Sequence, residues 1–328
     1  PDPDAGFTLS ETEEDSAQTQ EGKDITKKDE DTTEPSTDNP TENPKKDVVY
    51  EYAPADPEPE QQTTKLATTS ADPTAKTQEA TLDDAPTTPA LPVGSVTNPT
   101  TNVIKVVNNW VGKAAKELKI RLSNVNIKAE DAGRKAAMDV SGGGTTKVEL
   151  DGQNVLDSHE VPYQAGLRKQ GEGTLIITDE TNDEGKKITT PKSNDSGSLI
   201  AKGAGGNGAA GIGGSVAEGT KNITIEGYAT VHAAGGGSAA GIGGGGNGGN
   251  AENIIIRGHS KVTATTLGGA AIGGGYGSES GGSAKGIVIR DHATVAARSD
   301  TGDGAAIGAA GYNGKDTEAE VTIGTAGA

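Results

Sequence analysis

The stretch Gly208-Ala-Ala-Gly-Ile-Gly-Gly214 recurs three more times in this chain of 328 residues. The later copies are Ser238-Ala-Ala-Gly-Ile-Gly-Gly244, Gly269-Ala-Ala-Ile-Gly-Gly274 and Gly304-Ala-Ala-Ile-Gly308. The isoleucine of the motif steps from 212 to 242, 272 and 307, which gives repeats of 30, 30 and 35 residues. Repeats of this length are typical of solenoids.

One β-branched segment follows the motif in all four repeats, and a second follows in the first three. The first is Asn222-Ile-Thr-Ile225, then Asn253-Ile-Ile-Ile256, Gly286-Ile-Val-Ile289 and Glu320-Val-Thr-Ile323. The second is Ala229-Thr-Val-His-Ala233, then Ser260-Lys-Val-Thr-Ala264 and Ala293-Thr-Val-Ala-Ala297. No repeat contains an amphipathic helical segment, which excludes leucine-rich and helical repeats.

Strand alternation predicts which side chains face the core. Successive side chains point to opposite faces, so Ile223 and Ile225 face inward and Thr224 outward. Coils stack about 4.8 Å apart, so inward residues form ladders along the axis. The expected ladders are Ile212, Ile242, Ile272 and Ile307; Ile223 with Ile225, Ile254 with Ile256, Ile287 with Ile289 and Val321 with Ile323; and Val231, Val262 and Val295. These three ladders predict an all-β fold, a right-handed parallel β-helix with three strands per coil.

Less regular coils precede the repeats. Their expected strands lie in Lys119–Ile127, Ala137–Val140, Thr146–Leu150, Val155–Leu156, Ala165–Leu167, Gly173–Thr178 and Gly197–Ala201. Counting through to Ile323 gives about six or seven coils, and residues 119–328 form one domain. The glycine-rich segments at 243–250 and 273–282 lack the aspartates of a calcium-binding repeat, so we expect flexible loops there and no metal site.

Residues 1–101 differ in composition from the rest of the chain. The first hundred residues hold 23 acidic and 7 basic residues, a net charge of −16, and 13 of the 15 prolines. Such a segment buries too little apolar surface to offset its chain entropy, so it is predicted to be a disordered acidic spacer. Its charge argues against a nucleic-acid or anionic-membrane partner.

Residues 102–118 are predicted to cap the first coil. Asn102–Val107 has the pattern of a strand, and Asn108 or Asn109 can begin a short helix that ends near Leu118. Trp110, the only tryptophan, would cover the end of the core, with a sugar-stacking platform as the alternative. The last coil, by contrast, shows no cap after Ile323, so we expect a fragment that continues with more coils or a cap and that associates end to end.

Several motifs together resemble a known class of protein. They are Leu122-Ser-Asn-Val-Asn-Ile127, Met138-Asp-Val-Ser-Gly142, Val148-Glu-Leu-Asp-Gly152, Ala165-Gly-Leu-Arg168, Gly173-Thr-Leu-Ile-Ile-Thr178 and the repeated glycine motif. Residues 119–328 resemble large β-helical surface proteins of Clostridia-type gut bacteria, which are often labelled carbohydrate-binding. The resemblance implies extracellular placement and a binding or adhesive role, and it supplies no catalytic residues.

Two outward columns are the candidate ligand-binding site. After the second strand of three repeats come Glu226-Gly-Tyr228, Arg257-Gly-His259 and Arg290-Asp-His292. Stacking of the coils places Glu226, Arg257 and Arg290 in one column, and Tyr228, His259 and His292 in the next. Rings beside charged hydrogen-bonding groups suit a polysaccharide or host glycan, because rings cover C–H faces of sugars and charges bind hydroxyls or carboxylates. The alternative is a corner column that only stabilises the solenoid.

A second outward column offers a protein-binding strip: Ile176, Thr224, Ile255, Val288 and Thr322. A host mucosal protein or another wall component is therefore the alternative partner. A polysaccharide lyase or hydrolase is less favoured, because the best carboxylate pair, Glu226 and Asp291, is flanked by arginines that keep both groups ionised. We expect a non-catalytic bacterial surface binding protein or adhesin, which is extracellular, either secreted or cell-wall associated, and has no cofactor.

Overall fold

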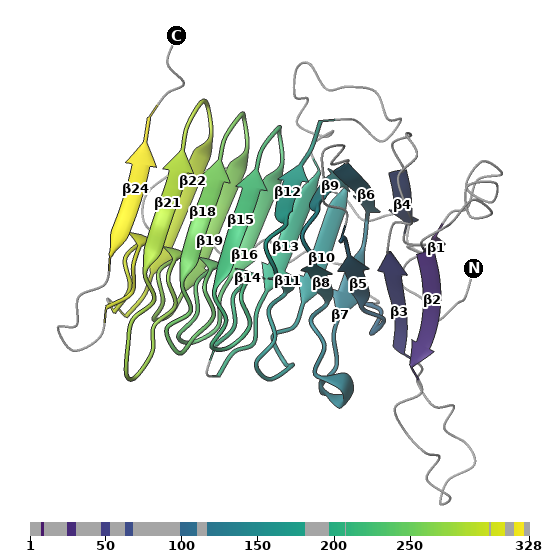
Figure 1. Ribbon diagram of the computed structural model, residues 1–328, viewed down its shortest axis with the longest axis horizontal. Helices are drawn as coiled ribbons and strands as arrows, with labels where there is room; N and C mark the ends of the chain where they lie inside the picture. Colours follow the sequence, from purple (N-terminus) through teal and green to yellow (C-terminus); the bar gives the residue numbers. More distant parts are fainter. Residues whose placement is uncertain are drawn as a thin grey trace, which may run out of the picture.

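The computed structural model describes residues 99–109, 117–180, 197–206, 208–301, 303–311 and 318–324, together with four strand backbones nearer the N-terminus. It confirms a parallel β-solenoid, in which three sheets run along the axis and surround one narrow core (Figure 1). Within the described part, six coils have all three strands, and a seventh has two.

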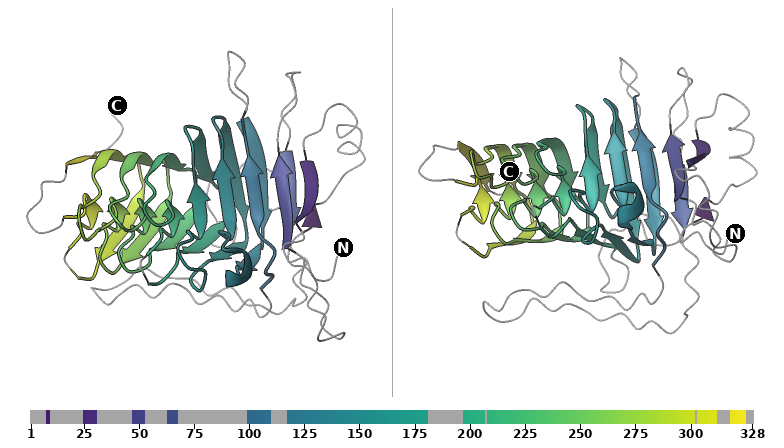
Figure 2. Two further views of the ribbon diagram at one scale, coloured as in Figure 1. Left: turned by 60° about the horizontal axis from the view of Figure 1, so that its bottom comes forward. Right: turned by 90° about the horizontal axis from the view of Figure 1, so that it is seen from below.

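The three sheets, which we call walls 1, 2 and 3 in chain order, take one strand from each coil. Wall 1 contains β5 (Ile104–Val107), β8 (Met138–Ser141), β11 (Leu167–Lys169), β14 (Ile212–Gly213), β17 (Ile242–Gly243), β20 (Ile272–Gly273) and β23 (Ile307–Gly308). Wall 2 contains β6 (Glu117–Ser123), β9 (Thr145–Asp151), β12 (Thr174–Thr178), β15 (Thr220–Ile225), β18 (Ala251–Ile256), β21 (Ala284–Ile289) and β24 (Ala319–Ile323). Two strands from the predicted spacer extend this sheet: β4 (Thr63–Ala67) pairs in parallel with β6, and β1 (Thr8–Leu9) pairs antiparallel with β4. Wall 3 contains β7 (Asn126–Lys128), β10 (Gln153–Asp157), β13 (Ser198–Lys202), β16 (Thr230–Ala234), β19 (Lys261–Thr266) and β22 (Thr294–Ser299). Figure 2 shows successive coils side by side along the long axis.

The register confirms the three predicted ladders. In wall 1, Ile212 pairs with Ile242, which pairs with Ile272. Wall 2 aligns Ile223 with Ile254, and wall 3 aligns Val231 with Val262. These side chains are buried in one continuous core, whereas Val295 in β22 and Ile307 and Val321 in the last coil are only partly buried.

The glycine-rich segments are stacked turns rather than the flexible loops expected. Gly245 N donates to Glu218 O of the preceding coil at 2.9 Å, and Gly275 N donates to Gly249 O at 2.8 Å. Glycine is required where the turns leave wall 1: Gly243 has φ of 140°, and a Cβ there would lie 2.0 Å from the carbonyl oxygen of Gly273. The missing side chains therefore allow adjacent backbones to approach closely.

The N-terminal predictions have mixed outcomes. The predicted spacer, residues 1–101, lies almost entirely outside the described residues; the exceptions there are β1 (Thr8–Leu9), β2 (Ile25–Glu30), β3 (Asp47–Tyr52), β4 (Thr63–Ala67) and residues 99–101. Most of the predicted capping helix, including Trp110, also lies outside them. Its last residue was assigned wrongly, because Leu118 belongs to strand β6. The predicted strand before it is β5, which pairs with β8 as part of wall 1.

A short 3-10 helix, η1 (Asp131–Gly133), interrupts the early coils. In the part of the chain described here, no helix has the length and apolar character needed to cross a membrane.

Candidate functional site

The backbone sets the register of the two predicted columns. Where wall 2 ends and the chain turns toward wall 3, Arg257 N donates to Ile225 O at 2.9 Å and Arg290 N donates to Ile256 O at 3.0 Å. Two residues later, His259 N donates to Gly227 O at 2.8 Å. Each charged residue and each ring therefore lies one coil above its equivalent, as the sequence predicted.

The turn itself depends on a left-handed residue between the two columns. Gly227, Gly258 and Asp291 occupy this position with φ of 66°, 73° and 63°. Asp291 replaces glycine in the last copy, and its Oδ2 accepts a hydrogen bond from Gly258 N at 3.2 Å. The left-handed conformation allows the sharp turn between wall 2 and wall 3.

The rings stack face to face along the axis. The centroids of Tyr228 and His259 are 5.1 Å apart with an interplanar angle of 12°, and those of His259 and His292 are 4.7 Å apart at 8°. Both faces of His259 are therefore covered by its neighbours, while the ring is exposed at its edge. A ligand beside this column meets ring edges, which offer hydrogen-bonding atoms, rather than ring faces.

The charged column is partly neutralised within itself. Arg257 Nε and Nη2 lie 2.6 and 2.5 Å from Glu226 Oε2, and the Glu226 side chain is only 12% exposed. Arg290 is held less closely, since its Nη1 lies 3.5 Å from Asp291 Oδ1 and its side chain is 38% exposed. Arg290 is therefore the better placed of the two arginines to bind an external anion or hydroxyl group.

The β-branched column covers the middle of wall 2. Register aligns Ile176 with Thr224, Thr224 with Ile255, Ile255 with Val288, and Val288 with Thr322. Alternation with the buried isoleucines places this column on the outer face of the wall, where Ile176, Ile255 and Val288 are half-buried and Thr322 is exposed. Thr224 is the exception, because it is buried. The β-branched column lies beside the Glu226–Arg257–Arg290 column, so both predicted surfaces belong to one wall.

A further charged column, which the sequence reading missed, begins each late strand of wall 2. Lys221 pairs in register with Glu252, and Glu252 with Lys285. Lys221 Nζ also lies 2.9 Å from Glu172 Oε1, so the sign alternates from coil to coil. In the late coils, the residue after each of these charged residues has a left-handed backbone conformation, with φ of 58° at Asn222, 53° at Asn253 and 66° at Gly286. The recurring asparagine or glycine after each charged residue could have indicated this column from the sequence. The charged residues are about 30 to 50 positions apart, however, so their pairing can be recognised only from the register of the strands.

The carboxylates considered for catalysis are engaged separately. Glu226 is paired with Arg257, whereas Asp291 accepts a hydrogen bond from the backbone N–H of Gly258 in the preceding coil. Over the described residues, no three His, Cys, Asp or Glu side chains form a group that could hold a metal ion.

Two titratable groups buried elsewhere belong to the early coils. Burial raises the pKa of Asp179 to about 7, although its Oδ2 accepts a hydrogen bond from Gly197 N at 2.7 Å. Burial lowers the pKa of the Lys169 ammonium to about 8, and its Nζ donates to the carbonyls of Gln170 and Gly171. Both side chains are bonded to nearby backbone, which indicates a structural role.

Comparison with known proteins adds no further assignment: no family model, curated protein or solved structure matches this chain.

Proposed function

We propose that this chain is a non-catalytic bacterial surface protein that binds an extended polysaccharide or host glycan along the outer face of wall 2. One observation carries the proposal: three outward columns run in register across β15, β18 and β21. They are the alternating charges that begin the strands, the β-branched strip in the middle, and the Glu226–Arg257–Arg290 column with its adjoining rings. A polymer aligned with the axis meets one member of each column at every coil.

Different columns contact different parts of the polymer. The β-branched strip supports the less polar face of the polymer by van der Waals contact. Arg290 and the edges of His259 and His292 bind hydroxyl groups or the carboxylate of an acidic sugar. Because the rings stack on one another, the corner is already ordered before binding, which lowers the entropy cost of recognition.

Secretion and attachment to the cell wall, with no cofactor, form part of the same proposal. They are supported by the sequence resemblance, by the absence of cysteine and by the acidic N-terminal segment. The β-branched strip favours a second candidate function, the binding of a host mucosal protein or another wall component through the same wall.

A glycan array with the full chain tests the proposal. Binding confined to one sugar class is expected, and it should be lost in Arg257→Ala/Arg290→Ala and in Tyr228→Ala/His259→Ala. Arg298→Ala is the matched control, because Arg298 is a partly exposed arginine on wall 3 with its own partner, Asp300. Binding that survives both double variants would remove this corner as the site. A blank array together with binding to a purified mucosal protein would instead favour the second function.

A further inference from the structure

Tyr163 places an exposed aromatic ring at the corner where an early coil turns from wall 3 to wall 1. The residue is 45% exposed, and its side chain is the only exposed one among the tyrosine side chains that the structure describes. Its backbone is left-handed, with φ of 72°, a conformation that a bulky residue rarely adopts. Strained residues of this kind are frequent at ligand sites, where the surrounding structure holds them in place.

The following coil holds this turn. Val216 N donates a hydrogen bond to Tyr163 O at 3.1 Å. Earlier in the same turn, His159 O accepts a hydrogen bond from Gly205 N at 3.2 Å. The backbone that carries the ring is therefore ordered before a ligand arrives, which lowers the entropy cost of binding.

Equivalent positions in three successive coils determine which face of the ring is open. Arg134, Tyr163 and Gly208 each lie four residues before the first residue of a wall 1 strand, namely β8, β11 and β14, and these strands pair in register. All three residues are left-handed, with φ of 46°, 72° and 75°. The Cζ atom of Arg134 lies over one face of the Tyr163 ring, 5.8 Å from its centroid. Gly208 has no side chain with which to cover the other face.

The backbone keeps that second face open. A Cβ at Gly208 would lie 2.7 Å from Ser238 N, so a side chain is disfavoured at this position. Gly205 and Gly206 of the same turn also lack side chains, and a Cβ on Gly206 would meet nothing within 4 Å. In the part of the chain that the structure describes, a flat ligand can therefore approach the ring from this side.

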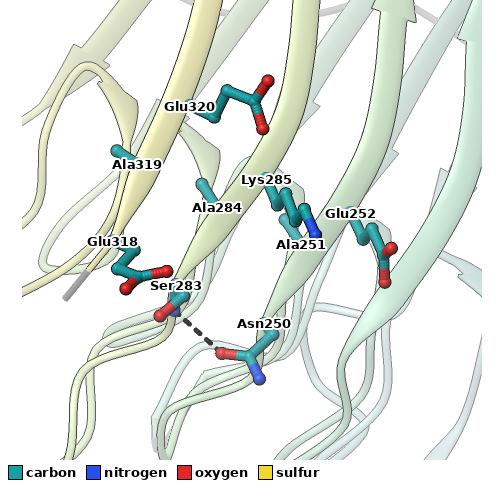
Figure 3. A pocket seen from close by; sticks show the side chains of 9 residues that line it. All are labelled: Asn250, Ala251, Glu252, Ser283, Ala284, Lys285, Glu318, Ala319 and Glu320. Atoms are coloured by element: carbon teal, nitrogen blue, oxygen red, sulfur yellow. Dashed lines mark hydrogen bonds between the residues drawn. The ribbon is translucent and has the colours of Figure 1, made fainter.

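Two other candidate surfaces offer a different kind of contact. On wall 2, the stacking of Tyr228, His259 and His292 leaves ring edges to a ligand. A hollow of about 520 Å³ lies at the start of β18, β21 and β24 (Figure 3), where charged side chains such as Glu252 and Lys285 line it. None of its described lining residues carries a ring. The open ring face of Tyr163 is provided by neither surface.

We propose that Tyr163 is a stacking platform for one pyranose ring of a neutral sugar. The C–H face of the sugar packs on the open face of the tyrosine ring, while Arg134 fixes the orientation of that ring from the opposite side by a cation–π contact. Arg134 Nε lies 4.0 Å from Asp131 Oδ1, too far for a hydrogen bond, so the guanidinium can donate to sugar hydroxyls at the edge of the ring.

The charges of Arg134 and Asp131 balance, which favours a neutral sugar over an acidic one. The platform lies at a different corner from the columns of wall 2, and it does not rest on the function proposed for that wall.

Saturation-transfer NMR with the full chain tests this inference. The probes are methyl β-glucopyranoside, methyl β-galactopyranoside and cellobiose at millimolar concentration, because a single stacked ring supports a Kd of only about 1 mM. We expect saturation transfer to the C–H protons of at least one probe. Binding this weak is not retained on a glycan array, so the experiment is separate from the test of wall 2.

Tyr163→Gly separates binding from folding. It removes the ring, and glycine adopts φ of 72° without strain, so the melting temperature should change little. We expect binding to weaken about 10-fold or more. Tyr163→Phe keeps the ring and should bind within about 3-fold of the unchanged chain. The matched control is Tyr228→Ala/His259→Ala, which removes rings from wall 2 only and should leave this signal unchanged.

Three results would overturn the proposal. The first is the absence of transfer to any of the probes, and the second is a signal that survives Tyr163→Gly or disappears in the wall 2 variant. The third is a marked fall in the melting temperature of Tyr163→Gly, which would show that Tyr163 stabilises the fold and is not kept for a ligand.

Discussion

The early and late coils follow the same path around the axis, but different interactions stabilise them. Among the described residues, every buried Asn, Asp and Lys side chain lies between positions 102 and 179, in the early coils. From position 197 onward, the buried polar side chains are Ser and Thr only. Late coils stack identical or similar residues, whereas early coils rely on specific hydrogen bonds between unlike residues.

Asn154 shows how an early coil is held. Its Oδ1 accepts from Val125 N at 2.9 Å, and its Nδ2 donates to Asp151 O and Ser198 O at 3.1 Å each. One buried amide thus joins three successive coils at the corner between walls 2 and 3. A corner of the late coils needs no buried amide side chain, because turns of similar sequence form backbone hydrogen bonds with the turn of the neighbouring coil. Backbone hydrogen bonds between repeated turns therefore replace buried side-chain hydrogen bonds in the late coils. These turns require glycine where adjacent backbones are in contact.

The largest expected effect is in a late ladder. Ile256→Asp would bury an unpaired charge between Ile225 and Ile289, at a cost of more than about 4 kcal/mol in the free energy of unfolding. The adjacent Ile255→Asp is the control, because Ile255 faces outward and is half-buried. Urea denaturation of both variants measures the difference. Equal loss of stability would show that the assigned strand parity is reversed.

A late turn should be nearly as sensitive. Gly243→Ala requires a side chain at φ of 140° and a Cβ 2.0 Å from Gly273 O, so we expect a loss of about 3 kcal/mol. Gly206→Ala is the matched control, since a Cβ there would meet nothing within 4 Å. Thermal unfolding should separate the two variants. Similar melting temperatures would indicate that the stacked turns tolerate displacement.

The early hydrogen bonds can be tested at Asn154. Asn154→Ala leaves the buried Val125 N–H and two carbonyls without their partner, at a cost of about 2 kcal/mol. In the late coils, exposed Asn250 accepts from Ser283 N at 2.8 Å, and water can replace it in Asn250→Ala. We therefore expect the second change to cost under about 1 kcal/mol in the same urea experiment. Equal costs would remove the distinction between the regions.

The smallest expected effect is pH-dependent and again belongs to the early coils. The pKa of Asp179 rises from 3.8 to about 7 on folding, because burial disfavours the charged carboxylate. The folded state therefore holds the proton more tightly, and stability should fall as the pH rises from about 4 to about 7. Asp179→Asn should remove this fall and gain about 1–2 kcal/mol at pH 8. Denaturation from pH 4 to 8 measures it.

The exposed Asp131→Asn is the control for that experiment and should keep the wild-type pH profile. If Asp179→Asn retains the same fall in stability between pH 4 and 7, another group is responsible for it.

The candidate columns could be predicted from the sequence because the late repeats are nearly equal in length. Once Ile225, Ile256 and Ile289 are aligned, Tyr228, His259 and His292 must follow at the same offset. The strands of the early coils could not be predicted in this way, because their sequences do not repeat. The alternation in Lys119–Ile127 predicts one strand, but Asn124 has φ of 53° and turns the chain from β6 into β7. No repeat of that sequence marked the corner.

What the sequence alone determined is the solenoid, its ladders and its outward columns, because strand alternation and a repeated length leave little freedom in how coils stack. Only the tertiary structure shows which contacts the stacked side chains make with one another. The rings face one another, and Arg257 is neutralised by Glu226, because coils about 4.8 Å apart bring aligned side chains into direct contact. The alternating charges of Glu172, Lys221, Glu252 and Lys285 likewise became a column only when the structure joined residues distant in sequence.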